Sequence, residues 1–72
     1  MLIGEISKSE TEKIRVQIKE YKGKRYIDCR LHFENEKGEW IPTKKGLTLN
    51  SETALKMVEY LQRASKGLEG QA

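Results

Sequence analysis

Basic and aromatic side chains recur on one side of a predicted β-hairpin between Lys13 and Phe33. With the period of two that a β-strand has, this segment divides into two strands around Lys22-Gly23. One face collects the apolar residues, and the other collects Arg15, Gln17, Lys19, Tyr21, Lys24, Tyr26, Asp28, Arg30 and His32. Cations that follow phosphates, together with rings that stack on bases, are the components of a groove for single-stranded nucleic acid. A solvated sheet face with ordinary lysines is the equally open alternative.

The turn predicts how the two strands pair. If Lys22-Gly23 is a two-residue loop, Tyr21 faces Lys24, and apolar residues face apolar residues along both strands. The same register places Arg15 directly opposite Arg30. Like charges in this position repel each other, so the pair is easiest to understand if an anion lies across it.

Shorter strands are expected on both sides of this hairpin. Met1 to Ile6 is expected either to add an edge strand or to dock across a partner chain. After a loop that ends at Gly38, two short strands are predicted, Glu39–Pro42 and Leu47–Leu49, because Pro42 cannot donate a ladder hydrogen bond. The sheet built from these neighbouring hairpins is antiparallel.

A helix is predicted at the C-terminal end. Asn50 is a good N-cap, and Glu52 suits the positive end of the helix dipole. The helix is expected to run from Ser51 to Ser65, with Gly67 ending it and a frayed tail from Leu68 to Ala72. Its apolar stripe is assigned to the sheet and consists of Ala54, Leu55, Val58 and Leu61.

The small size of the chain favours self-association. Its 72 residues predict one domain, 1–72, with a core from about residue 13 to residue 65, and only 36% of the residues are hydrophobic. Such a short chain usually needs a disulfide, a metal or oligomerisation to be stable. One cysteine and one histidine supply neither a disulfide nor a zinc site. A dimer is therefore expected, with Cys29 as a buried, inert thiol.

Several classes of function are disfavoured. His32 is the only histidine and is expected to be solvated, and no nucleophile motif or metal-binding loop is present. We expect no enzyme, no catalytic residue and no cofactor. No segment has the length of a membrane span or a signal peptide, so a cytoplasmic location is expected. The net charge of +3 leans towards an anionic partner.

Several short motifs in order resemble one family. They are Tyr21-Lys22-Gly23-Lys24, Ile27-Asp28-Cys29-Arg30, Gly38-Glu39, Pro42 and the run from Lys44 to Asn50. The chain from about Ile14 to Leu61 resembles the positive cofactor four family, transcriptional coactivators that bind single-stranded DNA. The resemblance implies an α+β fold, with a curved four-stranded antiparallel sheet, one C-terminal helix and a homodimer. The family's serine-rich N-terminal region is missing, so a minimal bacterial or phage member, in the nucleoid of its cell, is implied.

The resemblance also implies roles for individual residues. It makes Tyr21 and Phe33 base-stacking residues, although Phe33 and Arg30 have opposite strand parity, so a bulge or bend must lie between them. Trp40 has no aromatic counterpart in the eukaryotic coactivator, and core or dimer contact is favoured for it over an extra stacking platform. With the residues read from the sheet face and its turn, the predicted nucleic-acid site is Arg15, Lys19, Tyr21, Lys22, Gly23, Lys24, Arg30, Phe33, Lys44 and Lys45.

Three functions are carried forward. The first is a homodimer that binds single-stranded DNA with little sequence preference, as a transcription cofactor or a replication or repair accessory. The second is RNA binding, because stacking and phosphate contacts do not by themselves distinguish the sugar. The third is a protein-interaction adaptor that recruits RNA polymerase or replication proteins.

Overall fold

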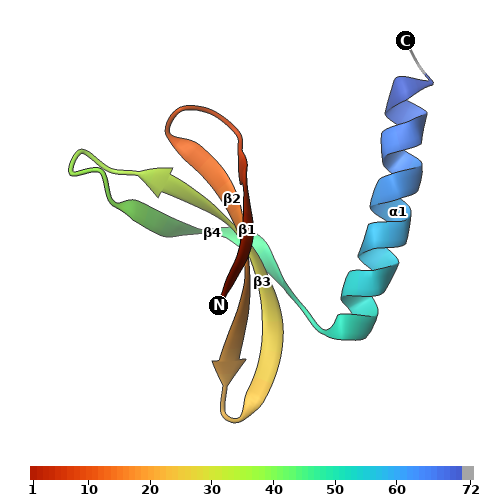
Figure 1. Ribbon diagram of the computed structural model, residues 1–72, viewed down its shortest axis with the longest axis horizontal. Coiled ribbons are helices and arrows are strands. Elements are labelled where there is room, and N and C mark those ends of the chain that lie inside the picture. The colour runs from red at the N-terminus through yellow and green to blue at the C-terminus, as the bar shows by residue number, and fades with distance from the viewer. Residues whose placement is uncertain (71–72) are drawn as a thin grey trace.

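The computed structural model describes residues 1–70, which form an open antiparallel sheet followed by one helix (Figure 1). The strands lie in chain order, β1-β2-β3-β4. Their bounds are Leu2–Ser7 for β1, Glu12–Tyr21 for β2, Lys24–Glu34 for β3 and Trp40–Leu49 for β4. The predicted fold of four antiparallel strands and one C-terminal helix is confirmed, and the possible edge strand at the N-terminus is β1.

The central hairpin pairs as its sequence predicts. Tyr21 lies opposite Lys24 and Arg15 lies opposite Arg30 in a regular ladder that extends to Phe33. Lys22 and Gly23 both have positive φ, 51° and 79°. Positive φ at both central residues is the signature of a type I′ turn, whose twist matches that of the two strands. Lysine therefore occupies a left-handed position that asparagine or glycine fills more often.

The fourth strand corrects one prediction. The segments Glu39–Pro42 and Leu47–Leu49 are not separate strands, because Trp40–Leu49 is continuous. The ladder with β3 shifts between Arg30 and His32, which face Gly46 and Pro42 respectively, so β4 carries extra residues there. A bulge of this kind accommodates the basic stretch that looked like a connection. It bends β4 and leaves β3 in register with β2.

The helix α1, Ser51–Glu69, begins where predicted and ends later. The side chain of Asn50 accepts a hydrogen bond from the backbone N–H of Thr53 at 2.8 Å, as expected of an N-cap. Gly67 does not end the helix, and Gly70 is the C-cap. Of the predicted tail, 68–69 are therefore helical, and 71–72 lie outside the described residues.

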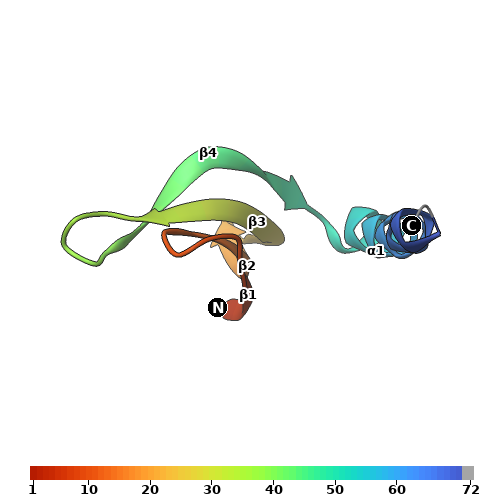
Figure 2. The same ribbon diagram turned by 90° about the horizontal axis from the view of Figure 1, so that it is seen from above.

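The helix does not cover the sheet, which corrects a second prediction. Figure 2 shows α1 to one side of the sheet, joined to it by the end of β4. The stripe assigned to the sheet is largely open, with Leu55 73% and Leu61 60% exposed. No hydrophobic residue among those described is buried. The apolar surfaces of the helix and of the sheet are thus both left without cover within one chain.

The buried side chains are polar ones. Asp28 is 2% and His32 is 4% exposed. The prediction of a solvated His32 is wrong, because the residue is buried and Nδ1 donates to the carbonyl oxygen of Arg30 at 3.1 Å. Cys29, predicted to be buried, is only half-buried on the open apolar face.

Candidate nucleic-acid interface

The interface is built on the polar face of the sheet, which we define by the rows of directly opposed residues. Directly opposed residues project from the same side of an antiparallel ladder. From the turn outwards, successive rows of β2 and β3 are Tyr21 with Lys24, Lys19 with Tyr26, Gln17 with Asp28, Arg15 with Arg30, and Lys13 with His32. Rings and cations therefore share the two rows nearest the turn, Gln17 and Asp28 form the middle row, and cations return in the rows of Arg15 with Arg30 and Lys13 with His32.

The turn of the hairpin presents the most open of these residues. Tyr21 is 65% exposed, and Lys22 Nζ lies 5.3 Å from the centre of its ring. Tyr21, Lys24 and Tyr26 also line an open pocket of about 430 Å³. A flat ring with one cation next to it in the chain and another directly opposite suits a base flanked by phosphates.

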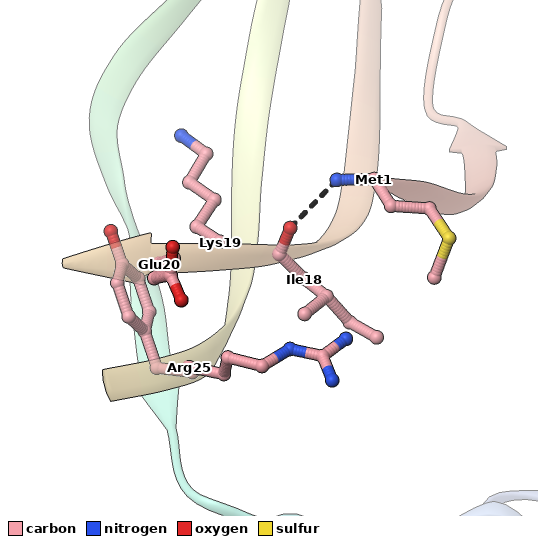
Figure 3. Close-up of a pocket in the computed structure, with 6 residues that line it drawn as sticks. Met1, Ile18, Lys19, Glu20 and Arg25 are labelled. Carbon is pink, nitrogen blue, oxygen red and sulfur yellow. Dashed lines mark hydrogen bonds between the residues drawn. The ribbon is translucent and has the colours of Figure 1, made fainter. Parts of the chain in front are cut away.

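A second pocket, of about 510 Å³, lies beside the edge of β2 (Figure 3). The backbone of Met1 closes this edge, since its nitrogen donates to the Ile18 carbonyl at 2.7 Å and its carbonyl accepts from Ile18 N at 2.9 Å. Lys19, Arg25 and Tyr26 all contribute to the lining. Arg25 and Tyr26 are absent from the predicted site. The signal for Tyr26 was available, because it is aromatic and shares the polar face with Lys24, whereas Arg25 is opposite Glu20 in a row of the other face.

Arg30 is held in place by three hydrogen bonds or ion contacts. Its Nε donates to Asp28 Oδ1 at 3.2 Å, its Nη1 donates to the carbonyl oxygen of Thr43 at 2.8 Å, and its Nη2 lies 3.2 Å from Asp28 Oδ1. Lys19 Nζ lies 3.6 Å from the other Asp28 oxygen, Oδ2. This buried oxygen has no hydrogen-bond partner among the described residues. Asp28 therefore orients the two cations beside it.

The opposed arginines have carboxylates of their own. Arg15 donates from Nε to Glu5 of β1 at 2.6 Å, and Lys13 Nζ lies 2.8 Å from the same oxygen. Lys13 and Arg15, in that order, hold the pKa of Glu5 below its usual value. Glu5 thus balances Arg15 while Asp28 balances Arg30, so the pair does not by itself require an external anion.

Lys44 and Lys45 lie in the bulge of β4 and are exposed. Thr43 shapes the bulge, because its hydroxyl donates to the Leu31 carbonyl at 2.8 Å and accepts from Lys45 N at 3.1 Å. Lys45 lines a pocket of about 310 Å³ together with Ile14, Cys29 and Leu31, which belong to the apolar face.

Phe33 is separated from the other predicted residues. The register shift that could have turned it lies in β4, and the ladder of β2 with β3 is regular up to Phe33 opposite Glu12. Phe33 therefore projects from the face opposite to Arg30 and is 42% exposed. Its stacking role stays a prediction.

Trp40 lies on the polar face and not in a buried core. It faces Glu34, two positions beyond His32 on the same side of β3. Lys13 Nζ lies 4.0 Å from the centre of the indole ring. Trp40 is half-buried, so part of this ring remains accessible.

Residues 1–70 contain neither a metal-binding cluster nor a membrane-spanning helix. No three His, Cys, Asp or Glu side chains gather there in a way that could hold a metal ion. The one helix of this part of the chain lacks the long apolar stretch that crossing a membrane requires.

Comparisons with known proteins agree with this architecture. The family model described as Transcriptional Coactivator p15 (PC4) matches residues 8–60. A PC4 homologue from Burkholderia pseudomallei has 32% sequence identity and a TM-score of 0.85, with 90% of this chain and 88% of that chain covered. The bacteriophage T5 homologue of the eukaryotic coactivator, described as implicated in recombination-dependent DNA replication, has 24% identity and a TM-score of 0.75. That match covers 96% of this chain and 80% of the phage chain. No curated protein matched. The chain belongs to the PC4 family of transcriptional coactivators.

Proposed function

We propose that the protein binds single-stranded DNA as a homodimer, with little sequence preference. The observation that carries the proposal is the exposed Tyr21, beside Lys22 and opposite Lys24, at the end of a polar face that continues to Arg30. The family to which the chain belongs supports the same reading.

The proposed mechanism combines ionic contacts with phosphates and stacking on a base. The basic residues neutralise phosphates and release counterions, and a base stacks on Tyr21. The predicted contacts with the sugar-phosphate backbone are Arg15, Lys19, Lys22, Gly23, Lys24, Arg30, Lys44 and Lys45. Every base has a flat face, so stacking discriminates little between sequences. The protein acts by binding and not by catalysis.

The homodimer is supported by the uncovered apolar surfaces. A stable small domain needs a buried core, and one copy of this chain buries no hydrophobic residue within 1–70. A second copy would cover the helix stripe that includes Leu55 and Leu61 together with the apolar face of the sheet. The 72 residues would then fold as one domain of a two-chain unit.

The cellular role follows from the same family. Transcription, replication and repair all expose single strands, so the protein would act as a transcription cofactor or as a replication or repair accessory in the cytoplasm. The description of the T5 homologue supports a role in replication. RNA polymerase or replication proteins are the protein partners that these roles would bring into contact with it.

Fluorescence anisotropy tests the proposal. Labelled oligo-dT of about 20 nucleotides, the matching RNA and a duplex are titrated at several salt concentrations. If about five phosphates are contacted, log affinity should fall against log salt with a slope of roughly −3.5 for the single strand. Equal binding to the duplex, or a slope near zero, would exclude the mechanism. Preference for the RNA strand would replace DNA by RNA as the ligand.

A further inference from the structure

We infer that Trp40, backed by Lys13, forms a second base-binding position on the polar face, at the end of the sheet opposite to Tyr21. The inference rests on the proposed binding of single-stranded DNA and adds a subsite to it. Its ligand is the flat face of a nucleotide base.

The geometry places this indole in line with the other predicted contacts. Trp40 faces Glu34, and the row of His32 separates it from the row of Arg15 and Arg30. The ammonium of Lys13, 4.0 Å from the ring centre, comes from β2 across the intervening β3. The ring therefore lies along the sheet surface towards β2, and its contact with Lys13 confirms the side from which it projects.

The contacts of Lys13 hold the platform in place. Glu5 Oε2 lies 2.8 Å from Lys13 Nζ and also accepts from Arg15, so the cation under the ring is tied to the neighbouring arginine. The Lys13 side chain is only 16% exposed. A ring supported by a fixed cation loses little conformational freedom when a base stacks on it.

The charge around the ring favours a base over a phosphate. Glu34 shares the row of Trp40, and Glu39 precedes it in the chain. Carboxylates at these two positions repel a phosphate, whereas a neutral base face tolerates them. The turn of the hairpin is basic instead of acidic, with Lys22 and Lys24 beside Tyr21.

The distance between Tyr21 and Trp40 sets the length of single-stranded DNA that could contact both rings. Lys24, the partner of Tyr21, and Glu34, the partner of Trp40, are ten residues apart on β3, which corresponds to about 34 Å of β-strand. Figure 1 shows β3 running between the β2–β3 turn and the loop before β4, so the two platforms belong to opposite ends of the sheet. A short oligonucleotide at the Tyr21 end would leave Trp40 free.

The single tryptophan of the chain makes the test direct. Intrinsic fluorescence is recorded while the protein is titrated with oligo-dT of about 12 nucleotides, within the usual range of site sizes. An abasic oligonucleotide of the same length serves as the matched probe. Anisotropy of a label on each strand measures the fraction bound. At equal saturation, the strand with bases should quench Trp40 and the abasic strand should not.

Variants at the same position provide the second readout. Trp40→Leu should weaken binding of the same oligo-dT by about five- to tenfold, near the lower end of the loss expected for one stacked base. Trp40→Phe, which keeps a ring, should lose less. Circular dichroism and unfolding of each variant identify any loss of fold. If a variant does not fold, the quenching of Trp40 in the unchanged protein decides whether a base binds there.

The outcomes separate the two proposals. Binding of oligo-dT without quenching of Trp40 would overturn the subsite and leave the proposed function standing. Quenching by the abasic strand to the same extent would also overturn it, because no base would then be needed. Absence of binding to any single strand would overturn both.

Discussion

Asp28, which is 2% exposed, forms an ion pair with the partly buried Arg30 on the polar face, in which Arg30 Nε donates to Asp28 Oδ1 at 3.2 Å. The two residues are neighbours on the same side of β3. Because the same carboxylate lies 3.6 Å from Lys19 Nζ, one acid sets the direction of two cations. The polar face is therefore ordered by contacts within the chain itself.

The substitution Asp28→Asn should destabilise the fold. The charge-assisted bond to Arg30 is lost, and a hydrogen bond to a charged group contributes about 1.5–3 kcal/mol, less here because Arg30 is partly exposed. Urea unfolding measures the change. Glu36→Gln, an exposed acid in the loop before β4, is the control and should shift stability by less than about 0.5 kcal/mol. Equal stability of the two variants would contradict the role of Asp28.

The substitution Glu5→Gln should strengthen binding to single-stranded DNA. It removes the carboxylate that pairs with Lys13 and Arg15, so both cations become available to phosphates. The salt slope should steepen by about 0.7 for each cation that gains a phosphate contact. Glu10→Gln, in the turn between β1 and β2, also removes one acid and is the matched control. The same slope in both variants would show that only net charge matters.

The contact of Glu5 with its two cations should also depend on pH. Lys13 and Arg15 lower the pKa of Glu5 in the folded chain. Its stabilising contribution is therefore complete above the unfolded pKa, and it is lost as the pH falls through the lowered folded pKa. Acid titration of unfolding, with Glu5→Gln as reference, measures this. Parallel curves from neutral pH to below pH 4 would refute the link.

The substitution Tyr21→Ala should weaken binding of single strands by about 1–3 kcal/mol if one base stacks on the ring. Tyr21 is 65% exposed, so the fold should change little. Tyr21→Phe is the control that keeps the ring, and its affinity should stay close to that of the unchanged protein. Titration of all three proteins with the same labelled oligo-dT separates the ring from the hydroxyl.

Two identical glycine substitutions should have opposite effects. A Cβ at Gly46 would lie 2.6 Å from the Cys29 carbonyl oxygen and 3.0 Å from Arg30 Cα, so Gly46→Ala must displace β4 from β3. Overpacking of this kind costs about 1–3 kcal/mol. At Gly67 nothing lies within 4 Å, and Gly67→Ala should stabilise α1 by up to about 1 kcal/mol. Thermal unfolding of both variants measures the contrast.

The substitution Leu61→Glu should shift the proposed homodimer towards monomer. Leu61 is 60% exposed within one chain, and a carboxylate would not be tolerated under a second copy. Lys56→Glu, on the other side of the helix by spacing, is the control and loses only a surface pair with Glu59. Sedimentation at several concentrations gives the dissociation constant. Equal dissociation of both variants would place the interface elsewhere.

Local pattern was enough for the central hairpin and the start of the helix. The period of two separates polar from apolar residues, and a two-residue turn leaves one register that keeps them apart. Asn50 likewise predicts the first turn of α1 because its cap bond is local. The family motifs extend from the hairpin through β4 to Asn50, so the family could be predicted even where the bounds of β4 could not.

Only the tertiary structure decided what surrounds each side chain on that face. Glu5 reaches Arg15 across β1 and β2, Thr43 holds Arg30 across the bulge, and Lys13 lies over Trp40. Periodicity assigns a residue to a face but contains no information on which distant segment covers that face. His32 and the helix stripe show the same limit, since burial depends on contacts between residues far apart in the chain. Those contacts bury His32 and leave the apolar stripe of α1 exposed.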